Sequence, residues 1–264
     1  MPQLGCNYSP QLMSLLGDGR VHVDWIKLSR WEVFQEELLV ARPVRPVLLH
    51  VLPGAGRPSF ADVDWDGLNR AMKDCASPHT ALHLEATRAD WEDGEPSDDE
   101  VVERLVAGTR MWASRMEAPL LVENVPFYDG VRGSLSPATD PDVIGEVCKR
   151  ADVGLLLDLA HLRVACWHRG EDPHSYLRRL PLERVREIHV CGPEMTEDMG
   201  LRDRHLEMGT EDYELLQFAL EQTDPLVVSL EYGGTGPKFV WRSEIDALER
   251  QVRMLDEMVH FTQH

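Results

Sequence analysis

The sequence predicts an α/β chain that folds as a single (β/α)8 TIM barrel, and three observations support this prediction. Eight short apolar segments alternate with helix-like stretches along the 264 residues. Each segment is almost continuously hydrophobic, as in parallel strands that are buried on both faces. The length suits one barrel domain over residues 1–264, because such a barrel typically takes about 250 residues.

The expected strands follow one another at intervals that leave room for a crossover helix. They span residues 4–8, 23–29, 46–53, 80–86, 119–125, 153–159, 186–191 and 226–232. The clearest amphipathic stretches between or after them are residues 99–117, 211–221 and 244–261. In the last stretch, Ile245, Leu248 and Val252 recur at helical spacing, which predicts a helix that packs on the barrel wall.

Two helix starts are marked by an aspartate followed by a proline, at Asp140-Pro141 and Asp172-Pro173. The aspartate can cap the first free amide groups, and proline suits the first helical turn. An open doubly wound sheet is the alternative architecture. The closed barrel is favoured, because the segment GCNYSP after the first expected strand lacks a G-x-G-x-x-G phosphate motif.

The composition argues against nucleic acid and the membrane as partners. The 46 acidic residues outnumber the 27 basic ones, for a formal net charge of −19, whereas tracking a nucleic-acid backbone requires clustered Lys and Arg. No apolar run approaches the roughly 18 residues of a membrane span, and the N-terminus MPQLGCNYSP lacks a secretory signal. Five scattered cysteines without a C-x-x-C pair indicate reduced thiols. A soluble, cytoplasmic protein is expected.

The stretch from Gly154 to Gly192 organises the predicted site and reads as strand, long loop, helix and strand. Asp158 ends the apolar run GLLLD, His161 follows three residues later, and His189 ends the next strand. Burying an isolated carboxylate costs free energy unless it is paired or bound to a metal. This pattern therefore predicts metal ligands at the ends of two strands.

The same strand-end pattern recurs along the chain. The C-terminal ends of barrel strands surround the active-site mouth, so six strands and one loop before a helix would bring together His50, His83, Glu123, Asp158, His161, His189, Asp203, His205 and Glu231. Imidazole with carboxylate suits iron, zinc or manganese. Nine ligands exceed the needs of one ion, which predicts two or three ions. The expected substrate contacts at the mouth are Tyr128, Tyr232, Gly233 and Gly234.

The remaining histidines serve as controls and are expected to be structural or exposed: His22, His79, His168, His174, His260 and His264.

Four stretches resemble the multinuclear non-heme iron-dependent oxidative enzymes, within the xylose-isomerase-like TIM barrels. They are LLVENVPFY, GLLLDLAHLRVACWHRGEDPHSYLRRLPLERVREIHVCGP, LRDRHLEMG and VVSLEYGG. The resemblance implies two or three iron ions and the use of dioxygen to oxidise a peptide, typically at cysteine residues of a ribosomally made precursor. Family members often receive the peptide from a separate recognition protein. Such a partner is expected here too, since no recognition domain follows the last helix.

The resemblance also implies three ligand sets: His50, His83 and Glu123; Asp158, His189 and Glu231; and His161, Asp203 and His205. Glu123 would be able to bridge the first two sets. One departure concerns His161, because many family members carry an Asn-Asn pair after the aspartate and a valine. The D-x-x-H arrangement resembles apurinic endonuclease IV, a related barrel with three zinc ions. A zinc-dependent phosphoesterase and a sugar isomerase or epimerase therefore stay open as alternatives, whereas a non-catalytic binding barrel is the weakest interpretation.

Overall fold

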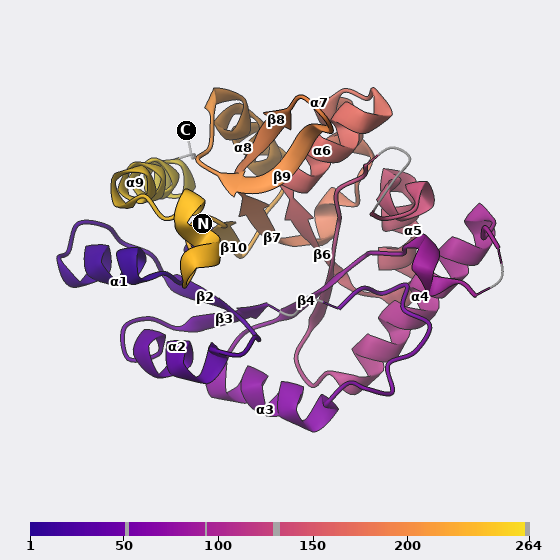
Figure 1. The fold of residues 1–264 in the computed structure, drawn as a ribbon, viewed down its shortest axis with the longest axis horizontal. Helices are drawn as coiled ribbons and strands as arrows, with labels where there is room; N and C mark the ends of the chain where they lie inside the picture. Colours follow the sequence, from indigo (N-terminus) through magenta and orange to yellow (C-terminus); the bar gives the residue numbers. More distant parts are fainter. Residues whose placement is uncertain (51–52, 93, 129–132, 262–264) are drawn as a thin grey trace.

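The structure, a computed structural model, describes residues 1–50, 53–92, 94–128 and 133–261. Eight parallel strands form one sheet in the order β3-β2-β1-β10-β7-β6-β5-β4 and curl into a nearly closed barrel (Figure 1). The strands are β1 (Gln3–Asn7), β2 (Trp25–Ser29), β3 (Val47–His50), β4 (Thr80–His83), β5 (Leu120–Glu123), β6 (Gly154–Asp158), β7 (Val185–Val190) and β10 (Val227–Leu230). All eight predicted strands are confirmed, although residues 51–52 of the predicted strand 46–53 lie outside the described residues.

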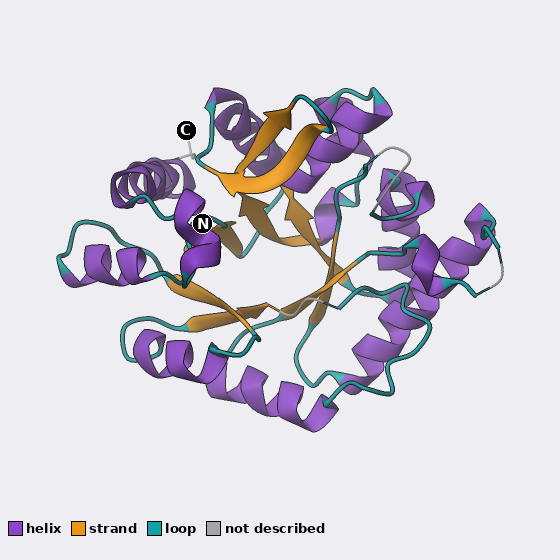
Figure 2. Cartoon of the chain, viewed as in Figure 1, coloured by secondary structure: helices purple, strands orange, loops and turns teal. Residues whose placement is uncertain are grey.

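The helices lie outside the ring of strands, as Figure 2 shows. They are α1 (Pro10–Gly17), α2 (Phe34–Ala41), α3 (Trp65–Cys75), α4 (Asp98–Arg115), α5 (Pro141–Ala151), α6 (Leu159–Arg169), α7 (Pro173–Arg179), α8 (Thr210–Gln222) and α9 (Ile245–Phe261). Helices α4, α8 and α9 confirm the three predicted amphipathic stretches. None of the helices in the described part of the chain is both long and apolar enough to cross a bilayer.

Both predicted Asp-Pro helix starts are confirmed. The Asp140 carboxylate accepts the backbone N–H of Asp142 at 2.9 Å at the start of α5, and Asp172 accepts that of Ser175 at 2.8 Å at the start of α7. Each proline occupies the first turn, where its missing N–H leaves no hydrogen bond unmade. These local caps explain why both boundaries are readable from the sequence.

The long loop predicted after Asp158 is wrong, because α6 begins at the next residue. Asp158 is the N-cap of α6, and its Oδ1 accepts the backbone N–H of His161 at 2.7 Å. Seven of the eleven residues of α6 are buried, so its hydrophobic side chains are not confined to one stripe. The amphipathic period that reveals surface helices is therefore weak in this segment.

A second correction concerns Asp203 and His205, which were expected in a loop. They lie on β9 (Gly200–Leu206), which pairs antiparallel with β8 (Gly192–Thr196) in a two-stranded hairpin that packs on α6. Figure 1 shows this hairpin beside the ends of β6 and β7. Most residues of β9 are only partly buried and several are charged, so the segment lacks the apolar character by which the barrel strands are recognised.

Helix α4 packs closely against the segment that follows β3, and Gly108 lies at the contact. A Cβ atom at this position would lie 1.9 Å from the carbonyl oxygen of Ala55. We expect Gly108→Ala to lower the free energy of unfolding by about 1–3 kcal/mol, the usual cost of forcing extra atoms into a packed interior. Denaturant unfolding measures this change. The control is Gly17→Ala, where nothing lies within 4 Å of the added atom; equal midpoints for the two variants would contradict the close approach.

Candidate metal centre

Strand register brings the predicted ligands together. His83 of β4 pairs with Glu123 of β5, and Asp158 of β6 pairs with His189 of β7. Side chains two residues apart on a strand point to the same face. The small apolar cluster of Ala81, Leu121 and Leu156 thus forms the layer directly below these polar side chains inside the barrel.

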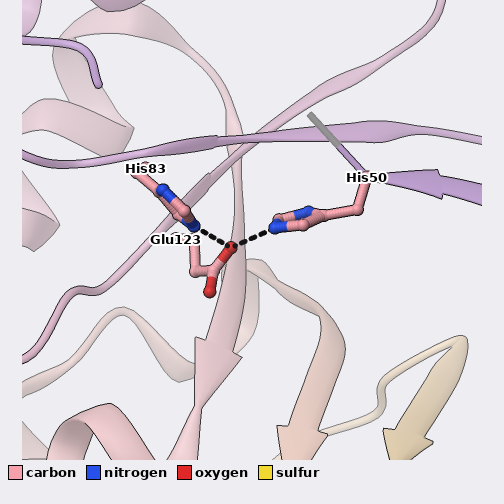
Figure 3. A group of neighbouring side chains, drawn as sticks. All are labelled: His50, His83 and Glu123. Carbon is pink, nitrogen blue, oxygen red and sulfur yellow. Dashed lines mark ion pairs between the residues drawn. The ribbon is translucent and has the colours of Figure 1, made fainter. Parts of the chain in front are cut away.

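The first group consists of His50, His83 and Glu123. The Nε2 atoms of His50 and His83 lie 3.5 and 3.4 Å from Oε2 of Glu123, and Figure 3 shows both imidazoles directed at this one oxygen. Glu123 is 1% exposed, and its Oε2 has no hydrogen-bond partner in the described part of the chain. Although burial alone would raise the pKa of Glu123, His83 and His50 hold it well below its usual range.

This geometry fits a divalent metal ion. Ligand atoms about 2.1 Å from one ion lie roughly 3.0–3.4 Å from each other at ordinary coordination angles, close to the distances around Glu123. A buried carboxylate oxygen without a partner is costly, and a shared ion would satisfy it. Nitrogen with oxygen donors suits iron, zinc or manganese.

The second group is formed by Asp158, His189 and Glu231. Nδ1 of His189 lies 3.9 Å from Oδ2 of Asp158 and 3.6 Å from Oε1 of Glu231. It is also 3.8 Å from Oε1 of Glu123, so this glutamate connects the first two groups through its two oxygens. Oδ2 of Asp158 is a second buried oxygen without a hydrogen-bond partner among the described residues. Burial raises the pKa of Asp158 to about 6.

The remaining predicted ligands surround Asp203. Its Oδ2 lies 3.4 Å from Nε2 of His161 and 3.1 Å from Nε2 of His205. In each imidazole the other nitrogen, Nδ1, faces a backbone carbonyl, that of Asn124 at 2.9 Å for His161 and that of Glu231 at 3.2 Å for His205. These contacts orient both rings toward Asp203. His205 has a φ of 50°, a strained conformation of the kind that persists at functional sites.

All nine predicted ligands therefore lie in one continuous cluster, which we call the nine-residue cluster. Two further groupings of its members link the sets, one of Glu123, Asp158 and His161 and one of His205 and Glu231 with Cys191. Cys191 is buried, and its Sγ lies 3.7 Å from Oδ1 of Asp203. No control histidine in the described part of the chain belongs to these groups, and His264 lies outside that part.

Sequence reasoning missed Lys27. This residue of β2 is 3% exposed, and its Nζ donates to Oε1 of Glu231 and lies 2.9 Å from Nε2 of His189. Although burial alone would raise the pKa of Glu231, Lys27 lowers it. A lysine inside the otherwise apolar strand WIKLS indicates a functional residue for the same reason as Asp158 at the end of GLLLD, because charged side chains are rarely buried. A buried cation is thus part of the centre.

Glu187 is a second residue that sequence reasoning missed. Its Oε1 accepts the Nε2–H of His189 at 3.0 Å and the hydroxyl of Ser229 at 2.7 Å, and its Oε2 lies 2.6 Å from Nε2 of His79. The hydrogen bond from His189 to Glu187 fixes the orientation of the imidazole, so that its Nδ1 points toward the nine-residue cluster. Carboxylates orient metal-binding histidines in the same way. The sequence could have indicated this role, because Glu187 lies two residues before His189 on β7 and therefore on the same face of the strand.

We expect Glu187→Gln to weaken metal binding about 10- to 100-fold while the barrel stays folded, because the ring of His189 loses its charged acceptor. Competition with a chromophoric chelator measures the affinity. Glu183→Gln is the matched control, since Glu183 is exposed and lies just before the same strand. Equal affinities for both variants would rule out an orienting role for Glu187.

A cavity of about 290 Å³ opens onto the cluster. Outside the cluster, its wall includes Asn7, Tyr8, Lys27, Trp31, Glu37, Gly233, Gly234, Thr235, Phe239 and Arg242. The two glycines thus lie where substrate contacts were expected. The two tyrosines do not line it: the hydroxyl of Tyr128 accepts the backbone N–H of Asp203, and the buried Tyr232 accepts that of Glu244, both at 3.2 Å.

Comparison with known proteins identifies the family. The model of the RiPP precursor modification enzymes MbnB/TglH/ChrH matches residues 70–252, more than half of the chain. The chain belongs to this family. The resemblance to the multinuclear non-heme iron enzymes is thereby confirmed. The description of this family is that of enzymes that modify precursor peptides.

Several curated relatives of this family member carry the name UPF0276 protein. One from Pseudomonas aeruginosa is 31% identical over 141 residues, which cover 50% of this chain and 48% of the relative. One from Anaeromyxobacter is 41% identical over 73 residues, 28% of this chain and 25% of the relative. The chain thus spans half or less of the length of these relatives.

Solved structures confirm the xylose-isomerase-like barrel. The IolI protein with a bound zinc atom superposes with a TM-score of 0.67 at 14% identity, covering 97% of this chain and 98% of its own. D-psicose 3-epimerase from Clostridium cellulolyticum gives 0.62 at 14% identity, with 99% and 100% coverage. At such low identity these likenesses establish the fold alone.

Proposed function

We propose that this chain is a multinuclear non-heme iron-dependent oxidase or oxygenase that uses dioxygen to modify a cysteine-containing precursor peptide. The observation that carries the proposal is the nine-residue cluster beside the cavity, in which one oxygen of Glu123 and one of Asp158 have no hydrogen-bond partner among the described residues. Family membership supports a peptide substrate. The mixed imidazole and carboxylate donors are typical of non-heme iron.

Two or three iron ions would be held by the sets around Glu123, His189 and Asp203. Iron held by these residues would supply the redox chemistry that activates dioxygen for reaction with a substrate thiol. Glu123 connects two sets, because each of its oxygens faces different histidines. Glu187 orients His189, and Lys27 offsets the charge of Glu231. No side chain has to act as a nucleophile.

The cavity wall positions the peptide and limits the access of water. Gly233 and Gly234 have φ values of 104° and 159°, and a Cβ atom on them would lie 3.0 Å from Ser9 and 2.6 Å from Phe239, so both positions favour glycine. They thus present backbone atoms rather than side chains to the cavity that the peptide would enter. We assign supporting roles to the two tyrosines: Tyr128 holds the backbone of Asp203, and Tyr232 holds the start of α9. A separate recognition protein would deliver the peptide.

The test is anaerobic purification, loading with ferrous iron, metal analysis and Mössbauer spectroscopy. The loaded protein is then mixed with dioxygen and with cysteine-containing precursor peptides encoded by neighbouring genes, each with and without the neighbouring proteins. Coupled iron signals and an oxidative mass change of a peptide are expected. Fully loaded protein that holds only zinc and hydrolyses an abasic-site duplex would overturn the proposal.

A zinc-dependent phosphoesterase of the endonuclease IV type is the second candidate. It is favoured by His161, a nitrogen donor 3.4 Å from Asp203, since nitrogen-rich sites suit zinc. The net charge of −19 opposes nucleic acid as the substrate. A sugar isomerase or epimerase is disfavoured, because its chemistry needs only one divalent ion and several members of the cluster would then have no role.

A further inference from the structure

Arg242 is a charged group at the metal centre that the proposed chemistry does not use. It ends the short 3₁₀ helix η4 (Pro237–Arg242) and lines the cavity together with His205 and Glu231. Its side chain is nine-tenths buried, with 7% of the residue exposed. A buried guanidinium in a cavity wall requires a partner, because charge without one is strongly unfavourable away from water.

No such partner is found among the described residues. Nε of Arg242 is buried without an acceptor, and no ion pair reaches the guanidinium, which lies over the ring of Phe239 at 4.5 Å. Two other arginines with little exposure are paired, Arg163 with Asp212 and Arg169 with Glu171. The part-buried Arg202 also has an Nε without an acceptor among the described residues, but it does not line the cavity. Arg242 thus differs from these arginines because it presents unused donors to the cavity.

The charge of the cavity also favours an anion. The four carboxylates of the nine-residue cluster would be offset by two divalent ions, and a third ion would exceed them. Lys27 and Arg242 add two positive charges to the wall, Glu37 adds one negative charge, and Glu187 beside His189 adds another. With two ions these charges balance, and with a third ion the loaded cavity is net positive, so a bound group with negative oxygen atoms would be attracted to Arg242.

We propose that Arg242 binds a carboxylate of the peptide substrate and so sets which residue reaches the metal cluster. This inference rests on the proposed function for the choice of a peptide. The planar guanidinium matches a carboxylate in a two-point contact. The guanidinium lies over the ring of Phe239, whose centroid is 5.4 Å from that of Trp31, and both rings line the same cavity. The carboxylate is either the C-terminus or the side chain of an Asp or Glu next to the modified residue.

Calorimetric titration of the iron-loaded full chain, kept anaerobic, tests this inference with three probes. They are the tripeptide Gly-Gly-Cys as the free acid, the same peptide as the C-terminal amide, and Gly-Asp-Cys amide. For the unmodified protein, we expect at least one of the two peptides with a carboxylate to bind about tenfold or more tightly than Gly-Gly-Cys amide. Preference for the free acid identifies the C-terminus, and preference for Gly-Asp-Cys amide identifies the side chain.

Arg242→Met should remove the preference while the melting temperature of the metal-free protein stays equal or rises, because an unpaired buried charge is lost. Arg204→Met is the matched control, since Arg204 also stacks on an aromatic ring, that of Trp241, but does not line the cavity. Equal binding of all three probes to the unmodified protein, an intact preference in Arg242→Met, or marked destabilisation of that variant would overturn the inference.

The oxidative function and the carboxylate site at Arg242 can be contradicted independently of each other. Loss of the carboxylate preference in Arg242→Met, together with iron-loaded protein that consumes no dioxygen, would overturn the oxidative function and leave the carboxylate site standing. Oxidation of a peptide that binds equally well as the acid and as the amide would support the oxidative function and overturn the carboxylate site.

Discussion

Glu123→Gln is expected to lose at least half of the bound metal while the barrel stays folded. Oε2 of Glu123 faces His50 and His83, and its Oε1 faces His161 and His189 at 3.5 and 3.8 Å. An amide carries no charge and replaces one oxygen with a nitrogen that binds metal poorly. Both sets that Glu123 connects would therefore be weakened together.

The measurement is elemental analysis after loading with excess ferrous iron and anaerobic desalting, with circular dichroism to follow the fold. Glu117→Gln is the control, because this carboxylate is exposed and pairs only with the exposed Lys73 among the described residues. His168→Ala provides a second control, since Nε2 of His168 faces the backbone carbonyl of Leu201. Full metal content in Glu123→Gln would contradict the assigned site.

Lys27→Met should destabilise the metal-free protein far more than the metal-loaded one. Lys27 is the buried partner of Glu231, and removing one member of a buried ion pair typically costs about 3–5 kcal/mol. Bound ions would supply positive charge next to Glu231 and replace much of what is lost. The difference in melting temperature between loaded and metal-free protein should therefore widen in this variant.

Thermal unfolding of both forms checks this expectation. Lys73→Met is the matched control, since Lys73 and Glu117 form an exposed pair at 2.7 Å whose side chains are 66% and 61% exposed. Such a pair contributes about 0–1 kcal/mol, and its loss should affect both forms equally. A uniform loss of stability in Lys27→Met would mean that Lys27 supports only the barrel.

The strands and most of the site were predictable because their signals are local. A parallel strand buried on both faces needs a run of apolar residues, and a carboxylate or imidazole at the end of such a run stands out. Glu123 and Asp158 are examples, each following three buried hydrophobic residues. Closure of the barrel then places the strand ends around one mouth.

Other features depend on contacts that no local pattern reveals. Helix α6 is buried on most sides, so its period is obscured, and the β8–β9 hairpin carries Asp203 and His205 on strands without an apolar run. Lys27 meets a partner 204 residues away. A buried cation is paired, as Lys27 is, or has no ion-pair partner among the described residues, as with Arg242, and only the assembly of the cavity walls decides between the two.

The amino-acid sequence by itself determined the barrel and the identity of the nine candidate ligands, since strand burial and donor chemistry are properties of short segments. Only the tertiary structure decided which atoms face one another, how Glu187 turns His189, and which cations remain to bind a ligand. Those properties arise from strand register and from packing between distant segments, because distances and burial exist only in the folded chain.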